Sequence, residues 1–378
     1  MDPKGTHIEE SRPLRVAMIG SKGLPALFGG IERHVEETGR RLAERGHEVT
    51  VFGRKPFCED MEYLGMKIRA LRSIPTKNLD TATNTLTTCV KTLSEPFDIY
   101  HFHGIGPSIF IWIPGMAGRR TVSTVHALDY RQSKWGGAAR FLLRMGERRA
   151  ALSADAVISV SRLMADQLSR RYSREIDYIP NGANISDPPP FSIGQQMGIE
   201  SGRYILTVGR FIVERGFHTL LEAFSGVDTD MRLLIVGDER FEKEYAGSLH
   251  RSADDRVVFP GYVSGSRLDE LYAHCAFYVL PSLVEGLPIS LMEAMSFARP
   301  VLVSDIPENL EVTGGTGHSF RAGDAGDLRR GLERMIGMDP AEAEESGSRG
   351  KARISAEYDW DRITDDIEKV YYRIMEGG

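Results

Sequence analysis

The sequence predicts an α/β protein made of two Rossmann-like domains, each built on a parallel sheet. The chain has 378 residues, more than one hydrophobic core of ordinary size requires. Short apolar runs alternate with helical patterns, as in right-handed strand–helix–strand units. Three consecutive prolines at 188–190 form a stiff segment near the middle of the chain, and this predicts a linker between two domains.

The first domain is expected at residues 1–185. It opens with RVAMIG (15–20), a continuous apolar run that is typical of a strand buried on both faces of a parallel sheet. A helix is expected from about Ile31 to Arg45. Further strands are expected at five later runs: EVTVFG, DIYHFHG, TVSTVHA, DAVISV and IDYIP.

The second domain is expected at residues 191–357. It opens with RYILTVG (203–209), and its other strands are expected at RLLIVGD, RVVFPG, AFYVLP and PVLVSD. Residues 358–378 have a helical pattern. Ligands of such folds bind beyond the carboxyl ends of the strands, so two facing domains would form a ligand-binding cleft.

Composition indicates a cytoplasmic globular protein, with 41% hydrophobic and 26% charged residues. The cysteines, Cys58, Cys89 and Cys275, lie far apart, which argues against a disulfide framework and against a zinc site. The first residues are polar, without the apolar region of a signal peptide. The longest apolar run, IFIWI (109–113), is too short to span a bilayer, which takes about 20 residues.

The most informative segment is PSLVEGLPISLMEAMSFARPV (281–301). Seven residues separate Glu285 from Glu293, and Pro288 suits a first helical position. Glu285 is therefore expected in a loop and Glu293 about a turn and a half inside a helix. The helix start would present three free backbone amides, where anions are favoured: those of Gly286, Leu287 and Ile289. A phosphate site beside two hydroxyl acceptors matches the chemistry of a nucleotide sugar.

This segment resembles the E-x7-E signature of retaining family-4 glycosyltransferases, which have the two-domain GT-B fold. The resemblance covers nearly the whole chain, and the first domain is similar to a subgroup often called rhamnosyltransferases. It implies that Glu285 accepts hydrogen bonds from donor-sugar hydroxyls and Glu293 from the ribose. It also implies a C-terminal helix that crosses back onto the first domain.

Two further segments follow the opening strands. Gly29 and Gly30 precede the first helix, where glycine lets backbone amides approach an anion. Arg210 and Arg215 lie beyond the strand at 203–209, and two cations at the end of a cleft-facing strand favour a bound anion. The resemblance implies that both segments hold the donor diphosphate, with Arg215 in place of the family's lysine. The alternatives are a structural turn and a solvated loop.

Three other positions have expected roles. His126 ends the run TVSTVHA, and the resemblance implies that it faces the donor sugar from the acceptor side; a structural histidine is the alternative. Val263 lies in the loop GYVSGS (261–266), which matches the loop whose backbone meets the nucleobase. Asn181, in IPNGAN, matches a linker-side turn and is expected to be structural.

No metal site and no cofactor other than the nucleotide sugar are expected. His101 and His103 lie on one face of a strand, but the sequence indicates no third ligand. Asp228 and Asp230 form a DxD pattern, which binds metal in the other large glycosyltransferase fold. Here it is expected in a polar turn at the amino end of a strand, away from the cleft.

Charge is distributed unevenly along the chain. Residues 1–185 contain 27 basic and 20 acidic residues, a net charge of +7, whereas the remainder has 20 basic and 33 acidic, a net charge of −13. The segment 131–151 reads as a basic amphipathic helix. Its charged stripe consists of Arg140, Arg144 and Arg148. Its apolar face consists of Phe141, Leu142 and Met145. This helix either contacts the inner face of an anionic membrane or packs on the first domain.

The sequence therefore predicts a metal-independent retaining glycosyltransferase of the hexosyltransferase type, with a glycan or lipid-linked acceptor and no nucleic-acid partner. The alternatives are a nucleotide-sugar epimerase of the same fold and a non-catalytic nucleotide-sugar-binding protein. The predicted catalytic residues are His126, Arg210, Arg215 and Glu285. The predicted donor-binding residues are Gly29, Gly30, Val263, Gly286, Leu287 and Glu293.

Overall fold

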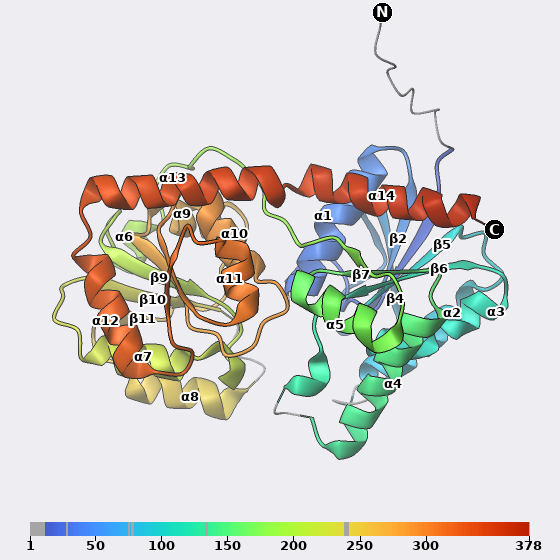
Figure 1. The fold of residues 1–378 in the computed structure, drawn as a ribbon, viewed down its shortest axis with the longest axis horizontal. Helices are drawn as coiled ribbons and strands as arrows, with labels where there is room; N and C mark the ends of the chain where they lie inside the picture. The colour runs from blue at the N-terminus through green and yellow to red at the C-terminus, as the bar shows by residue number, and fades with distance from the viewer. Residues whose placement is uncertain are drawn as a thin grey trace, which may run out of the picture.

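Two α/β units with parallel sheets lie side by side, as the sequence predicts (Figure 1). The structure is a computed structural model, and it describes residues 12–27, 29–74, 76, 79–132, 135–237 and 242–377. The predicted fold class is confirmed.

The first sheet has eight strands in the order β3-β4-β2-β1-β5-β6-β7-β8. Every neighbouring pair is parallel except β3–β4. The strands are β1 (Arg15–Ile19), β2 (Glu48–Arg54), β3 (Met61–Tyr63), β4 (Met66–Leu71), β5 (Ile99–His103), β6 (Arg120–Val125), β7 (Ala156–Ser159) and β8 (Asp177–Tyr178).

The second sheet has six parallel strands in the order β11-β10-β9-β12-β13-β14. The strands are β9 (Tyr204–Val208), β10 (Arg232–Val236), β11 (Val257–Val258), β12 (Phe277–Leu280), β13 (Val301–Ser304) and β14 (His318–Phe320). Every residue of β12 and β13 is buried, which explains their uninterrupted apolar sequences.

Helices cover the sheets and provide the crossovers between parallel strands (Figure 1). In the first domain they are α1 (Gly30–Glu44), α2 (Asp80–Thr92), α3 (Trp112–Met116), α4 (Gly137–Ser153) and α5 (Arg162–Tyr172), with 3-10 turns η1 (Pro107–Phe110) and η2 (Asp129–Arg131). In the second they are α6 (Gly194–Met197), η3 (Val213–Arg215), α7 (Phe217–Ser225), α8 (Lys243–Ser252), α9 (Ser266–His274), α10 (Ile289–Ser296), α11 (Pro307–Thr313), α12 (Ala325–Ile336) and α13 (Pro340–Glu357). The last is α14 (Trp360–Glu376).

Strand order reverses once in each sheet, between β1 and β5 in the first and between β9 and β12 in the second. The loops beyond the carboxyl ends of such strands diverge, which leaves room for a ligand. The segments with predicted functional residues follow these strands or the neighbouring β6, except for the loop 261–266, which follows β11.

Three strands lie outside the sequence expectations: β3, β4 and β14. β3 and β4 form the only antiparallel pair in the described part of the first sheet and extend its edge beyond β2. β14 extends the second sheet beyond β13. All three are edge additions, so they widen the sheets without moving the cleft.

The last two helices run end to end along one side of both domains (Figure 1). α13 packs against α10 of the second domain, whereas α14 packs against α1 of the first. The α14 residues Trp360, Ile363 and Ile367 are buried in the same apolar cluster as Val16 and Met18 of β1. The expected return of the chain to the first domain is therefore present.

The two passages of the chain between domains lie against each other. The backbone N–H of Ala183 donates a hydrogen bond to the carbonyl of Tyr358, at 2.9 Å. Ala183 also forms an isolated parallel bridge with Asp359. The proline segment 188–190 continues from this point without regular secondary structure.

Candidate functional site

The carboxyl ends of the two sheets meet around Gly286. A Cβ atom added to this glycine would lie 1.9 Å from the carbonyl oxygen of His126, so only glycine permits this approach. Nearby, a Cβ atom on Gly30 would lie 3.6 Å from the side chain of Ile289. The amino ends of α1 and α10 therefore face each other across the domain boundary, and both favour an anion.

Positive charge is concentrated beyond β9, where Arg210 and Arg215 follow the strand. Burial lowers the pKa of Arg210 from its ordinary value, and repulsion from Arg215 lowers it further. Arg215 forms an ion pair with Glu285, whose side chain is 8% exposed. Three of the predicted catalytic residues thus lie in one partly buried charged group.

Glu293 points from α10 toward the first domain. Its carboxylate lies 3.7 Å from the guanidinium of Arg33 on α1. Burial raises the pKa of Glu293, and attraction to Arg33 opposes that rise. Arg33 was not among the predicted site residues, because its pairing with a residue 260 positions later leaves no local signal.

The segment before the glycine turn is attached to α1 by two carboxylates. The N–H of Lys22 donates to Glu32, at 2.9 Å, and the N–H of Ala26 donates to Glu36, at 2.8 Å. Both glutamates are buried although they lie on a helix. They fix the loop that leads to Gly29, and sequence reasoning missed them because acidic residues on a helix usually face solvent.

His126 lies directly after β6 and is buried. Its Nε2 atom is 3.3 Å from Nδ1 of His103, and its ring stacks edge-on against His34 at 4.8 Å between centroids. Burial first, and the neighbouring imidazoles second, hold the pKa of His126 well below its usual range. The ring is therefore neutral at pH 7.

Asn181 connects the two halves of the site. Its side-chain amide donates a hydrogen bond to the carbonyl of Leu287, at 2.9 Å, in the loop before α10. Its side-chain oxygen lies 3.0 Å from Nδ1 of His34. The asparagine expected to be structural therefore links a donor-side loop to the first-domain histidines.

The loop 261–266 lies close to the first domain. The hydroxyl of Tyr262 donates to the carbonyl of Ala26, at 3.4 Å. Val263 is partly buried against an apolar cluster that includes residues of both domains. The predicted base-binding loop thus lies opposite the segment before the glycine turn.

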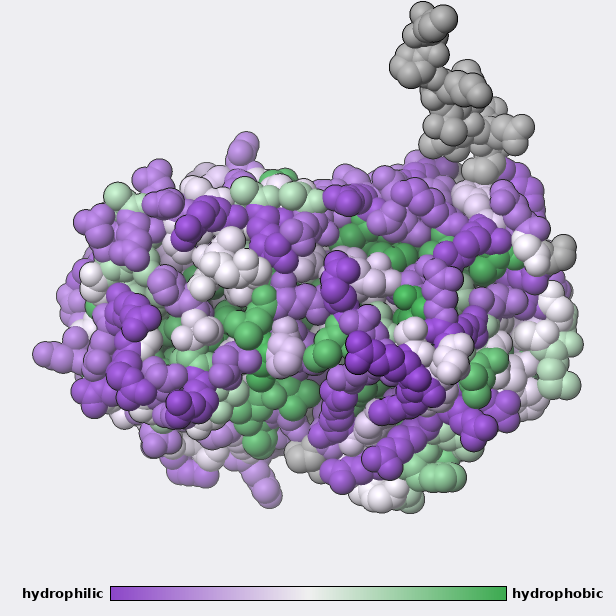
Figure 2. Space-filling model, viewed as in Figure 1, coloured by the Kyte–Doolittle hydropathy of each residue, from purple (hydrophilic) through white to green (hydrophobic). Residues whose placement is uncertain are grey.

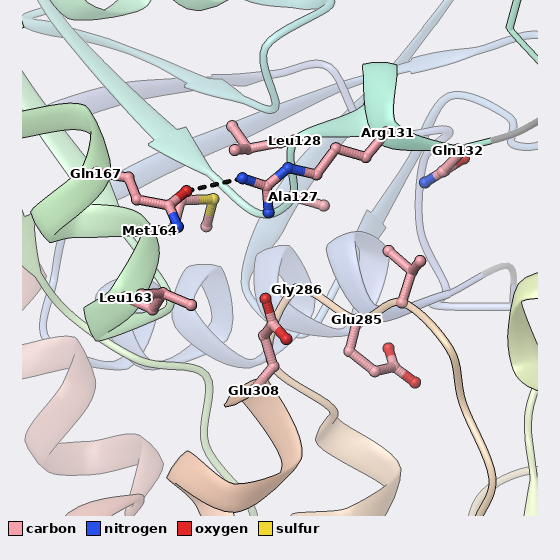
Figure 3. Close-up of a pocket in the computed structure, with 11 residues that line it drawn as sticks. Ala127, Leu128, Arg131, Gln132, Leu163, Met164, Gln167, Glu285, Gly286 and Glu308 are labelled. Carbon is pink, nitrogen blue, oxygen red and sulfur yellow. Dashed lines mark hydrogen bonds between the residues drawn. The ribbon is translucent and has the colours of Figure 1, made fainter. Parts of the chain in front are cut away.

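A small pocket with a mixed polar and apolar lining adjoins Glu285 and Gly286, and both domains line it (Figure 3). Arg131 reaches toward it and donates a hydrogen bond to Gln167, at 2.8 Å. Glu308, at the start of α11, faces it from the second domain, and burial raises the pKa of this carboxyl. The pocket measures about 30 Å³, enough for a water-sized group. Sequence reasoning missed Arg131, Gln167 and Glu308.

The DxD pattern lies away from this site. Asp228 and Asp230 fall between α7 and β10, at the amino end of the strand, as expected. Asp230 forms an exposed ion pair with Arg203. Its surroundings are those of a solvated turn.

The basic helix α4 exposes both its arginines and its apolar side chains. Arg140, Arg144 and Arg148 are exposed, and Phe141 and Leu142 are 67% and 51% exposed. The helix packs on the domain through another face, which contains Gly146, Glu147, Ala150 and Ala151. Figure 2 shows hydrophilic and hydrophobic side chains intermixed at the lower right, where Figure 1 places α4.

Two family models match successive parts of the chain. Residues 28–187 match the model described as Glycosyltransferase Family 4. Residues 202–337 match the model described as Glycosyl transferases group 1. Together the two matches include every residue of the predicted site.

Similar proteins align along nearly the full chain. Alpha-maltose-1-phosphate synthase of Mycolicibacterium smegmatis is 26% identical over 405 residues, covering 96% of this chain and 100% of that protein. Among solved structures, sucrose-phosphate synthase from Thermosynechococcus elongatus has a TM-score of 0.80 at 23% identity, covering 97% of this chain and 100% of the other. Anabaena HepE in complex with UDP and glucose has a TM-score of 0.81 at 19% identity, with 95% and 100% covered. Both structures share the fold.

Proposed function

Because this chain belongs to the family-4, group 1 glycosyltransferases of the GT-B fold, we propose that it transfers a sugar from a nucleotide-diphosphate sugar to a glycan or lipid-linked acceptor. The family assignment favours transfer over epimerisation and over binding without catalysis. The observation that carries the proposal is the group of Arg210, Arg215 and Glu285 facing two helix amino ends.

The donor diphosphate would lie between the Gly29–Gly30 turn and the arginine pair. Two partly buried cations that repel each other are stabilised by an anion. Backbone amides at the starts of α1 and α10 supply further donors. As the bond to the sugar breaks, negative charge grows on the leaving phosphate, and fixed cations stabilise that charge most in the transition state.

The two glutamates would bind the hydroxyls on either side of the diphosphate. Glu285 would accept hydrogen bonds from the donor sugar, and Glu293 from the ribose. Each carboxylate is now paired with an arginine, Glu285 with Arg215 and Glu293 with Arg33. Donor binding would therefore exchange ion pairs for hydroxyl contacts, and it would release Arg215 toward phosphate.

His126 would face the reacting carbon from the acceptor side as a neutral imidazole. Front-face transfer suits this site: the acceptor oxygen attacks the anomeric carbon while the bond to phosphate breaks, and the leaving phosphate takes the acceptor's proton. The anomeric configuration is then retained. Glu308, Arg131 and Gln167 surround the pocket next to Glu285 and would position acceptor hydroxyls.

A panel of nucleotide sugars in thermal-shift and turnover assays tests the proposal. A donor at 100 times its Kd would add about 2.7 kcal/mol of stability. NMR coupling at the product's anomeric position should show retention, and an inverted product would remove the front-face mechanism. Activity should persist in excess EDTA; loss of activity that Mn²⁺ restores would contradict metal independence.

We also propose that α4 attaches the first domain to an anionic membrane surface, which would bring the acceptor side to a lipid-linked glycan. The exposed arginines and the exposed Phe141 and Leu142 support this. No helix among the described residues is long and apolar enough to cross a membrane. Each basic residue near an anionic surface contributes about 1 kcal/mol, screened by salt.

Vesicle co-sedimentation tests the attachment. Binding should require anionic lipid, weaken as salt rises, and be lost when Arg140, Arg144 and Arg148 are changed to glutamate. The matched control changes three exposed second-domain arginines to glutamate: Arg321, Arg330 and Arg349. The control should keep vesicle binding if contact is made through α4, whereas equal loss in both variants would leave only net charge as the cause.

A further inference from the structure

Three histidines from separate parts of the first domain converge beneath the cleft. His34 lies on α1, His103 ends β5 and His126 follows β6. One ring nitrogen from each lies within 4.8 Å of the others, and all three side chains are buried. From sequence, His103 had no third ligand in view; the fold supplies two partners from distant segments.

The tautomer of His34 can be derived from its neighbour. Asn181 donates through its amide nitrogen to the carbonyl of Leu287, so its side-chain oxygen is the atom that faces Nδ1 of His34. That oxygen can only accept, and Nδ1 of His34 must therefore carry the hydrogen. The other ring nitrogen, Nε2, is left with an unshared lone pair, and it is buried without a hydrogen-bond partner among the described residues.

This arrangement is the one that metal-binding histidines adopt, with one ring nitrogen held by an oxygen acceptor and the other directed at the ion. The Nε2 atom of His103 is also buried without a hydrogen-bond partner in the described part of the chain, whereas its Nδ1 atom is the one that faces His126. Buried nitrogens without partners are costly, so each requires an explanation.

The spacing of the ligand atoms also fits. Nδ1 of His103 lies 3.3 Å from Nε2 of His126. Two nitrogens bound to one tetrahedral zinc ion at 2.0–2.1 Å are about 3.4 Å apart. The nitrogens of the three rings lie within 4.8 Å of one another, so the third would have to approach by up to about 1.4 Å when the ion binds.

His101 belongs to the same cluster but differs from the other three. Its Nδ1 is 2.6 Å from the hydroxyl of Tyr371, and its Nε2 is 2.7 Å from the hydroxyl of Thr124. Both ring nitrogens are therefore already used. The cluster thus contains one fully satisfied histidine beside three that converge.

We propose that His34, His103 and His126 form a binding site for a zinc-like transition-metal dication, and that its occupation inhibits the enzyme. Three neutral imidazoles suit Zn²⁺, Co²⁺ or Ni²⁺, whereas Mg²⁺ and Ca²⁺ prefer oxygen ligands. The fourth coordination position would take water or a small anion from the cleft. The inhibition rests on the proposed function, because the metal would inhibit by holding His126 away from the donor sugar. The metal binding itself does not rest on the proposed function.

Cobalt provides a direct probe of binding. The wild-type protein, freed of metal, should develop the visible absorption of tetrahedral Co²⁺ on titration, and Zn²⁺ should abolish it by competition. His103→Gln should weaken Co²⁺ binding at least tenfold, by analogy with losses at metal-site neighbours. The matched control His101→Gln removes a buried imidazole that is not a ligand and should retain the spectrum.

Activity supplies a second readout. Zn²⁺ should inhibit the wild-type enzyme and His101→Gln, EDTA should reverse the inhibition, and His103→Gln should resist it. If His103→Gln does not fold, His34→Gln takes its place, with circular dichroism as the check. Absence of a cobalt spectrum, or equal cobalt affinity in wild type and His103→Gln, overturns the site. A spectrum without inhibition supports the metal site and instead contradicts the role of His126 in transfer.

Discussion

The carboxyl edges of the two sheets have the same topology and opposite chemistry. The edge of the first sheet is lined by neutral, fully buried imidazoles: His34, His101, His103 and His126. The edge of the second is lined by charged groups: Arg210, Arg215, Glu285 and Glu293. Both edges lie at a switch point of a parallel sheet, where the fold leaves room for a ligand.

The position of the ligand site is thus determined by the topology of the fold, whereas the chemical class of the ligand is determined by the side chains at the site. Charged residues remain partly solvated or paired, and they suit a doubly phosphorylated donor. Neutral imidazoles can be buried at lower cost than charged groups, and they suit a reacting centre from which protons of the solvent are excluded. We therefore expect acid to affect the edge of the first sheet most, and removal of a cation to affect the edge of the second.

Acid should produce the largest effect, and it should act on the first domain. The pKa of buried His34 is lowered to about 4, and those of His101, His103 and His126 are held well below their usual range. Unfolding lets these rings take up protons near pH 6.5, so their stabilising contribution is present above that pH and is lost as pH falls toward 4. His34 alone accounts for about 3 kcal/mol.

Tryptophan fluorescence can follow the first domain separately. All three tryptophans, Trp112, Trp135 and Trp360, belong to the first domain or to α14 packed on it. Fluorescence should therefore change at a higher pH than the part of the far-UV circular dichroism signal that comes from the second domain. A single transition, common to both signals and confined to pH below 4, would contradict the comparison.

Loss of a cation should be the next largest effect, and it should act on the donor edge. Arg210→Ala removes a charge-assisted contact with phosphate, of order 1.5–3 kcal/mol. We expect kcat/KM to fall about ten- to hundredfold, with kcat reduced more than donor affinity because charge grows in the transition state. Steady-state kinetics with a donor series measures both.

Arg203→Ala is the matched control for that change. Arg203 is in the same domain, is half-exposed, and pairs with Asp230 at the amino end of β10. Its loss should leave kcat/KM within about twofold, because exposed ion pairs contribute under about 1 kcal/mol and this one is far from the cleft. Equal losses in the two variants would remove Arg210 from the donor site.

The smallest effect is expected where the two edges meet. Arg33→Gln breaks the cross-domain pair with Glu293 and also the pairs that Arg33 forms with Glu36 and Glu37 on its own helix. Because the Arg33 side chain is 35% exposed, the loss of the cross-domain pair should lower the free energy of unfolding by less than about 1 kcal/mol. Arg40→Gln is the control, because Arg40 pairs with Glu37 and Glu44 on its own helix. A difference in denaturant midpoint between the two variants measures the cross-domain pair; no difference would mean that the pair contributes nothing.

The central strands of each sheet could be predicted from sequence, because strands buried on both faces of a parallel sheet have uninterrupted apolar sequences. RVAMIG and AFYVLP became β1 and β12 within a residue or two. The edge strands β3 and β14 are three residues long and only partly buried, so neither length nor pattern marks them. Short exposed edges are common in natural sheets, which explains the omission.

The residues of the site also divide into those that a local sequence pattern indicates and those that it does not. Glu285 and Glu293 lie in one continuous string and could be singled out with their helix. Arg33, Asn181 and Glu308 acquire their surroundings only when distant segments meet, and no local pattern records such meetings. The histidine cluster is the clearest case: its three converging members lie on separate segments of the chain, and only His126 had a predicted role in the site.

The path of α14 affects the order in which the protein can fold during synthesis. Residues of this helix, the last to leave the ribosome among the described elements, fill part of the first domain's core beside β1, one of the first. The second domain, by contrast, has all six of its strands before α14 begins. A nascent chain can therefore complete the later domain first, while the earlier one waits with an exposed apolar surface. The amino-terminal half is thus the one that exposes part of its core for longer during synthesis.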